Sequence, residues 1–297
     1  MLTLAFLCAH AVLMIAAVLV VGRKPAQWAG ATLFLAGCFL LEWFAPVDIT
    51  LRAIMAFGGV LALVATIAVA ASATPQWSAG FRLLHLLTWG YRIRAGHTRP
   101  VRSVRIIGRL IVEALATGAA CLLLRHIIHA PLPAAASALV RLLAGIVFCY
   151  ALAAFAADLI HFCFLGSGSA MRPIHVTPVA ARSLRDFWGK RWNRAMSAWL
   201  YRFIFWPLAH RHHPNLGLIC VFLVSAAMHA WLPLVALGAS AAFSAGSFFC
   251  LQGVFILAED RLHVRAWPIP LARMWTLAIL LATSPLYIYP YLSLLHL

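Results

Sequence analysis

Charged residues are scarce in this sequence, and acidic residues are the scarcest. Only 10% of the 297 residues are charged, with seven Asp or Glu against 23 Lys or Arg, while 64% are hydrophobic. Soluble domains carry roughly a quarter of their residues as charged side chains, so this composition excludes a soluble globular protein. The sequence predicts an all-α membrane protein that crosses the bilayer several times.

Several other features are absent. The seven cysteines are scattered through apolar runs without paired spacing, which excludes a disulfide framework and a zinc ribbon and predicts reduced core residues. There is neither an internal repeat nor a polar segment long enough for a basic soluble domain, so nucleic acid is not an expected partner. We expect one membrane domain over residues 1–297, with no metal and no bound cofactor.

Long apolar runs are the main feature that is present. A membrane-spanning helix needs roughly 17 to 25 mostly apolar residues, and the chain supplies about eight such runs. Pro285 and Pro290 interrupt the eighth. The first run has Arg23 and Lys24 after it and no basic residue before it, the reverse of a secretory signal, so it should remain as an anchor. The predicted spans are 2–21, 27–45, 51–71, 106–128, 138–165, 215–236, 240–258 and 271–295.

The basic residues predict an orientation. If the chain crosses eight times, every Lys and Arg except Arg52, Arg125 and Arg141 falls on one side. Since cytoplasmic connections carry the excess of Lys and Arg, that side is the cytosol and both termini lie outside. The membrane would be a bacterial cytoplasmic membrane or, in a eukaryote, the endoplasmic reticulum. The formal charge of +16 suits a surface that meets anionic lipid and polyanionic ligands from the cytosol.

Two connections mix aromatic and basic residues in the manner of helices at the membrane interface, 72–105 and 166–214. In the second, Gly166–Ser169 is expected to be a flexible exit, and Pro173 and Pro178 keep the next stretch out of a helix. A helix can begin at Ser183, with its hydroxyl as the cap and Asp186 as the acidic partner of a capping box.

His229, inside the apolar run 215–236, is the best candidate for chemistry. Placing an ionisable side chain within a span costs free energy, and such residues are commonly functional. A histidine can also stabilise helix packing through a hydrogen bond to a neighbouring helix. Burial favours the neutral imidazole, which can accept a proton as a general base. Ser225 lies one turn earlier on the same helical face and can orient the ring or bind a ligand. The segment around Asn193 has two interpretations, an interfacial anchor and an active-site wall.

The string Ser183-Leu-Arg-Asp-Phe-Trp-Gly-Lys-Arg-Trp-Asn193, followed by Val224-Ser-Ala-Ala-Met-His229 and then by Phe248-Phe-Cys-Leu-Gln-Gly-Val254 with Glu259, resembles the wax synthase branch of the membrane-bound O-acyltransferases. Together with Phe81–Trp89, the resemblance covers residues 80–290, and residues 1–79 are the amino-terminal spans, where it is weaker. The segment containing Phe187–Asn193 is its most specific part.

The resemblance implies re-entrant and interfacial helices around a reaction chamber, in which acyl-coenzyme A meets a hydroxyl acceptor such as a long-chain alcohol. It implies that His229 and Asn193 carry the chemistry. His229 would remove the alcohol proton, and Asn193 would either donate to the thioester carbonyl or hold the thioester in line. For the segment from Phe187 to Asn193 to reach His229, it must dip into the bundle. The expected substrate-binding residues are Trp188, Lys190, Arg191, Trp192, Arg194 and Ser225, with the cations as candidates for coenzyme A phosphates or for lipid phosphate.

Other interpretations remain open from the residues. Asp158 and His161 share one face of the fifth span and, with Glu113, could form a proton relay, which makes a transporter the main non-enzyme alternative. An inactive homologue that binds lipid is a third. The chain has Ala226 and Ala230 where the family often has glycine and an acidic residue beside the histidine, which leaves the acceptor open. His210-Arg-His-His213 is more typical of a solvated stretch than of a metal site.

Overall fold

The computed structural model describes residues 2–22, 24–72, 78–88, 104–166 and 172–297, and every regular element in these ranges is helical. The predicted all-α class is therefore confirmed. The chain divides into two compact units, residues 1–91 with 227–243, and residues 92–226 with 244–297. Each unit is described by itself, and the expectation of a single membrane domain stays a prediction.

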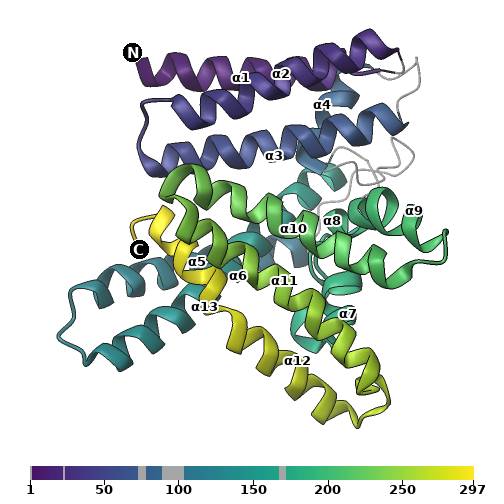
Figure 1. Ribbon diagram of the computed structural model, residues 1–297. Helices are drawn as coiled ribbons and strands as arrows, with labels where there is room; N and C mark the ends of the chain where they lie inside the picture. The colour runs from purple at the N-terminus through teal and green to yellow at the C-terminus, as the bar shows by residue number, and fades with distance from the viewer. Residues whose placement is uncertain (1, 23, 73–77, 89–103, 167–171) are drawn as a thin grey trace. The chain divides into compact units, whose positions relative to one another are not determined.

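The first unit is built on three long helices, α1 (Leu2–Val20), α2 (Pro25–Phe44) and α3 (Ile49–Ser72), which lie side by side (Figure 1). Proline at the first position of α2 suits a helix start, because it has no N–H to leave unpaired. The Asp48 carboxylate accepts hydrogen bonds from the main-chain N–H groups of Thr50 and Leu51 and caps α3. The short helix α4 (Ala79–Thr88) packs on α1 and α3, in the connection expected to hold interfacial helices.

The second unit holds most of the remaining helices. The helices α5 (Val104–Ile128) and α6 (Ala134–Gly166) form a hairpin, and α12 (Ile269–Thr283) and α13 (Pro285–Leu294) lie near the carboxyl terminus. The helices α10 (Pro214–Leu237) and α11 (Ala239–Arg261) belong largely to this unit and are joined through Gly238. Its φ of +99° is a conformation that glycine adopts without strain, so the chain reverses there in one residue.

The number of spans was predicted to be about eight. Six described helices are long and apolar enough to cross a membrane, namely α1, α3, α5, α6, α10 and α11, and the pair α12 and α13, bent by 47° at Ser284, makes a seventh if it counts as one span. The chain is a multi-pass membrane protein. The predicted span 27–45 is the helix α2, which contains Gln27 and Glu42 and falls outside the six. Because an odd count reverses one end of the chain, the orientation of the termini stays a prediction.

The connection between α6 and α10 is largely helical but broken into short pieces. It contains a 3₁₀ turn at Pro178–Ala180, α7 (Leu184–Asp186), α8 (Arg194–Leu200) and α9 (Trp206–Ala209). As predicted, residues 172–177 are not helical and a helix begins after Ser183. Two π-helices, Phe187–Arg191 and Tyr201–Phe205, separate these helices. Such insertions are rare and are frequent at functional sites. The predicted flexible exit at Gly166–Ser169 falls largely outside the described residues.

Candidate active site

The start of α7 is anchored by two side chains. Ser183 Oγ accepts the main-chain N–H of Asp186 at 3.0 Å, so the predicted cap is confirmed. The predicted capping-box partner is shifted by one residue, because the Asp186 carboxylate accepts from Arg182 N–H at 3.2 Å and not from that of Ser183. The carboxylate of Glu259, on α11, accepts the Leu184 N–H at 2.8 Å and is 3% exposed. Glu259 therefore fixes the helix start that precedes the aromatic segment.

The aromatic segment enters the apolar core of its unit through Trp188. The Trp188 ring lies against Phe222 of α10 and against Phe248 and Phe249 of α11, with ring centroids 5.6 to 6.4 Å apart. Its Nε1–H donates to Gln252 Oε1 at 3.2 Å. Burying an indole with its N–H paired is favourable, so Trp188 holds the segment among the helices. This packing supports the predicted insertion of the segment as far as Trp188.

Asn193 is held in an unusual conformation at the start of α8. Its φ of 38° and ψ of 61° lie in the left-handed region, which Asn adopts more readily than most residues. Its side-chain Oδ1 accepts the main-chain N–H of Met196 at 3.2 Å and caps α8. The cap occupies the oxygen of the carboxamide, and the Nδ2 group has no hydrogen-bond partner among the described residues. The Asn193 side chain is therefore rigid and keeps its donor end available.

His175 is a site residue that the sequence reasoning did not identify. Its Nδ1 accepts the main-chain N–H of Asn193 at 3.1 Å. Because a main-chain N–H can only donate, this nitrogen carries no proton, and the ring is the neutral tautomer protonated at Nε2. The ring also lies 4.4 Å from that of Trp192, centroid to centroid. Burial lowers the pKa of His175 to about 4, and the nearby Arg109 lowers it further, against a hydrogen bond with the main chain of Ala153 that raises it.

Residues 174–176 and 191–194 run beside each other as a short paired segment. Val176 N–H donates to the Arg191 carbonyl, and Arg194 N–H donates to the Ile174 carbonyl, both at 2.9 Å. His175 lies between these two bonds. The non-helical stretch 172–177 thus forms the support on which Asn193 rests, and no local pattern in the sequence marks it.

Two of the three predicted phosphate-binding cations form bonds to other groups of the protein. Arg191 Nε pairs with Asp186 at 2.7 Å, and its NH1 group donates to the Thr177 carbonyl at 3.3 Å. Arg194 NH1 donates to the Pro173 carbonyl at 3.2 Å. Lys190 is exposed. The two arginines therefore hold the 172–177 support in place, and Lys190 is the member of the cluster that is most accessible to a ligand.

The depressed pKa of His175 predicts that acid weakens the fold. The folded-state pKa of about 4 lies below the ordinary value of 6.5, so the unfolded chain binds the proton first. Stability that is complete above pH 6.5 should be lost as the pH falls toward 4, by up to about 3 kcal/mol from this group. Thermal unfolding in detergent between pH 7.5 and 4.5 measures this loss. The loss should be smaller in His175→Asn, and an identical pH dependence would contradict it.

His229 lies on α10 in the part of the helix that belongs to the first unit, and its side chain is partly buried. Ser225 is buried four residues earlier on the same helix. Two residues after His229, Trp231 donates its Nε1–H to the Glu42 carboxylate at 2.7 Å, and the other oxygen of Glu42 contacts His10 Nε2 at 2.9 Å. Glu42 is fully buried. This buried polar cluster was not predicted, although His10 and Glu42 each interrupt an apolar run.

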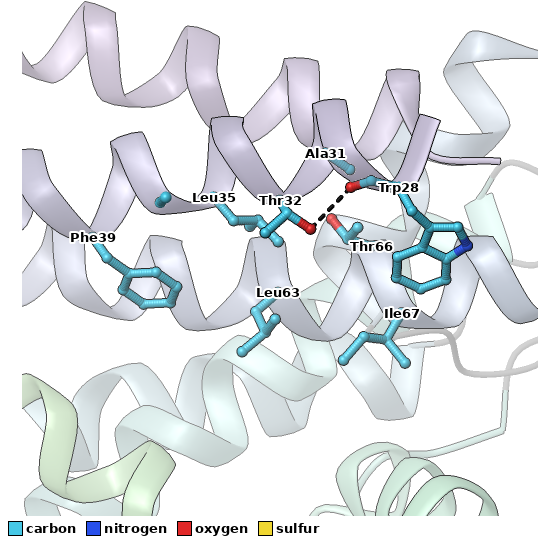
Figure 2. Close-up of a pocket in the computed structure, with 9 residues that line it drawn as sticks. Trp28, Ala31, Thr32, Leu35, Phe39, Leu63, Thr66 and Ile67 are labelled. Carbon is cyan, nitrogen blue, oxygen red and sulfur yellow. Dashed lines mark hydrogen bonds between the residues drawn. The ribbon is translucent and has the colours of Figure 1, made fainter. Parts of the chain in front are cut away.

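An apolar groove follows α2 and α3 in the first unit (Figure 2). Its volume is about 360 Å³. The hydroxyl of Thr32 is turned to the carbonyl of Trp28 at 2.9 Å and so adds no free polar group. At one end, the ring of Phe39 meets Trp231 edge-on, with centroids 5.1 Å apart. The groove thus ends beside the turn of α10 that carries His229. The lining residues are Trp28, Ala31, Thr32, Leu35, Ala36, Phe39, Leu63, Thr66 and Ile67.

One of the acidic residues that suggested a proton relay is already paired with a cation. Asp158, which is 3% exposed, forms an ion pair with Arg109 of α5. Tyr150, on the same helix α6, lies against Trp192 with ring centroids 5.6 Å apart and the ring planes tilted by 31°. The ion pair joins α5 to α6 and favours a structural role for Asp158.

The two predicted catalytic residues belong to different units, Asn193 to the second and His229 to the first. The predicted approach of their side chains therefore stays a prediction. Within the second unit the structure brings together Asn193, Trp192 and His175. Within the first unit it joins Trp231, two residues after His229, to Glu42.

Comparison with known proteins supports the resemblance. Residues 171–251 match the family described as membrane bound O-acyl transferase. The chain is 31% identical over 135 residues to the probable long-chain-alcohol O-fatty-acyltransferase 2 of Arabidopsis thaliana, covering 41% of this chain and 39% of the relative. It is 28% identical over 139 residues to the probable long-chain-alcohol O-fatty-acyltransferase 7 of the same plant, covering 42% and 41%. The match thus spans about two fifths of the length of these relatives.

Proposed function

We propose that this chain, which is similar to the wax synthase-like membrane-bound O-acyltransferases, moves an acyl group from acyl-coenzyme A to the hydroxyl of a long-chain alcohol or similar lipid. The observation that carries the proposal is the rigid Asn193, capped through its oxygen with its amide donor left available, in the segment that matches the family. The names of the two relatives suggest the class of acceptor.

The proposed reaction transfers one acyl group and passes one proton through His229, from the acceptor hydroxyl to the departing thiolate. His229 removes the proton from the acceptor hydroxyl as the oxygen attacks the thioester carbonyl. The new C–O bond forms, the C–S bond breaks, and the proton leaves with the coenzyme A thiolate. Asn193 Nδ2 would donate to the carbonyl oxygen as negative charge develops there. The cap on Oδ1 favours this role, because the alternative of holding the thioester through the amide oxygen would break the bond to Met196.

The donor would approach the segment that carries Lys190. An exposed ammonium group next to two fixed guanidinium groups is a suitable contact for the phosphates of coenzyme A. Because Arg191 and Arg194 already bind the protein's own main chain, we expect Lys190→Ala to raise KM for acyl-coenzyme A without unfolding the protein.

The test is a transfer assay with purified protein in detergent or nanodiscs. Radiolabelled acyl-coenzyme A is supplied with alcohols of increasing length, and the lipid products are separated. A new ester that requires both substrates supports the proposal. If no hydroxyl acceptor among long-chain alcohols, sterols and diacylglycerol yields an ester, the proposal fails. Uptake of a solute by proteoliposomes, lost in Asp158→Asn, would instead support a transporter.

The groove along α2 and α3 suggests a measurable chain-length preference. We propose that it holds the hydrocarbon chain of the acceptor. Ala36 is exposed and lines the groove, so Ala36→Phe fills it without disturbing the core. Each buried CH₂ group is worth about 0.8 kcal/mol, so excluding two or more should lower the preference for a C16 over a C8 alcohol by roughly tenfold or more.

The matched control is Leu33→Phe, a residue of the same helix that is 72% exposed and outside the groove. It should leave the ratio of C16 to C8 products unchanged. An unaltered ratio in Ala36→Phe, with the protein folded and active, would remove the groove from the proposal and leave the acyl transfer itself in place.

A further inference from the structure

The main-chain N–H of Asn193 has an uncommon partner. In most helix starts the residue at this position leaves its own N–H to water or to a side chain three residues later. Here it donates to an imidazole nitrogen from a non-helical segment, His175, which is 18 residues earlier in the chain. With the cap on Oδ1 and the left-handed backbone, this bond determines the direction in which the carboxamide points.

We propose that His175 is a positioning residue that holds Asn193 in the conformation needed for acyl transfer. This inference rests on the proposed function, because it assigns a role to His175 through the role of Asn193.

The residues around His175 hold its ring in place and favour an unprotonated Nδ1. Trp192 covers one part of the ring, and the paired main chains of 174–176 and 191–194 prevent it from moving along the segment. Arg109, whose positive charge faces the ring from α5, disfavours protonation of the imidazole. Since Nδ1 must stay unprotonated to accept the Asn193 N–H, the charge on Arg109 favours the hydrogen bond.

A purely packing role would not require a nitrogen at this position. The oxygen of an asparagine side chain can occupy nearly the same place as Nδ1 of histidine and can accept the same hydrogen bond, whereas alanine or leucine cannot. His175→Asn keeps the hydrogen-bond acceptor, and His175→Leu keeps only an apolar side chain of similar bulk. Comparing the two variants therefore distinguishes the effect of the hydrogen bond from the effect of packing. His213→Ala is the control, because His213 is exposed just before α10.

The kinetic test uses the transfer assay with purified full-length variants. His175→Leu should lower kcat roughly fivefold with KM for acyl-coenzyme A unchanged, since one net hydrogen bond is worth about 1 kcal/mol. His175→Asn should stay within about twofold of the parent protein, and His213→Ala should match it. In the double variant His175→Leu with Asn193→Ala, the loss should equal that of Asn193→Ala alone, because the two residues act as a unit.

Additive losses in the double variant, or equal losses in His175→Leu and His175→Asn, would overturn the inference. A second measurement is independent of activity. Hydrogen–deuterium exchange of a peptide spanning residues 190–196 should be faster in His175→Leu and unchanged in His175→Asn. Unchanged exchange in His175→Leu would overturn the positioning role. If exchange is faster in His175→Leu but the parent protein transfers no acyl group, the proposed function is wrong and the contact of His175 with Asn193 is still supported.

Discussion

Replacing His229 with alanine should abolish measurable acyl transfer while leaving the protein folded. A general base contributes roughly 10²- to 10⁴-fold to the rate, and His229 is the base to which the proposed reaction assigns the hydroxyl proton. The His229 side chain is partly buried, so alanine leaves a small space in α10 and not a deep cavity in the core. The measurement is kcat for ester formation from acyl-coenzyme A and a long-chain alcohol.

His213→Ala, at the start of the same helix, is the matched control and should retain full activity. His229→Gln preserves the size of the side chain and a hydrogen bond, yet cannot accept the proton near neutral pH, so it should be as inactive as His229→Ala. Transfer that survives in both His229 variants at more than a few per cent would remove His229 from the mechanism. The similarity of residues 171–251 to the family would be unaffected by that result.

Replacing Glu259 with alanine should strongly destabilise the second unit. The carboxylate accepts the N–H groups of Leu184 at 2.8 Å and Arg185 at 3.5 Å and the indole N–H of Trp275 at 3.2 Å. Each buried donor left without an acceptor costs about 1–3 kcal/mol. The loss of all three should therefore cost several kcal/mol and lower the apparent melting temperature in detergent by about 10 °C. Activity should fall with it, because α7 leads directly into the aromatic segment.

The adjacent Asp260 provides the control. It is an exposed residue that pairs with Arg185 and, at 3.8 Å, with Arg265. Surface ion pairs contribute about 0–1 kcal/mol, so Asp260→Ala should change the melting temperature by only a few degrees. Glu259→Gln, which keeps one acceptor oxygen, should fall between the two. If Glu259→Ala were no less stable than Asp260→Ala, the anchoring role of Glu259 would be wrong.

The sequence predicted those structural features that depend only on residues near one another in the chain. Apolar runs without internal charge have only one way to satisfy their main-chain groups in lipid, so the helical spans followed from composition. The start of α7 followed from Ser183, because a cap acts on residues within one turn. The expected count was about eight spans, and six or seven described spans are long and apolar enough, because Glu42 and Gln27 lower the apolarity of α2. The residues of this helix nevertheless pack beside α1 and α3.

The roles of the cations show where a local pattern is ambiguous. Lys190, Arg191 and Arg194 look alike in the sequence as a basic patch beside aromatic residues. In the structure, Arg191 and Arg194 support residues 172–177, and Lys190 is exposed. The difference depends on which carbonyl groups lie within reach of each guanidinium group, and a neighbouring segment folded against the helix supplies them.

By itself, therefore, the sequence determined the membrane class, most of the helices and the resemblance to the family, since these depend on periodicity, on composition and on a contiguous motif. Only the tertiary structure showed that Glu259 caps a helix 75 residues away, that Glu42 joins His10 to Trp231, and that His175 accepts the N–H of Asn193. Hydrogen bonds between distant residues depend on positions set by packing of the whole unit, and a partner of this kind leaves no spacing in the chain from which it could be predicted.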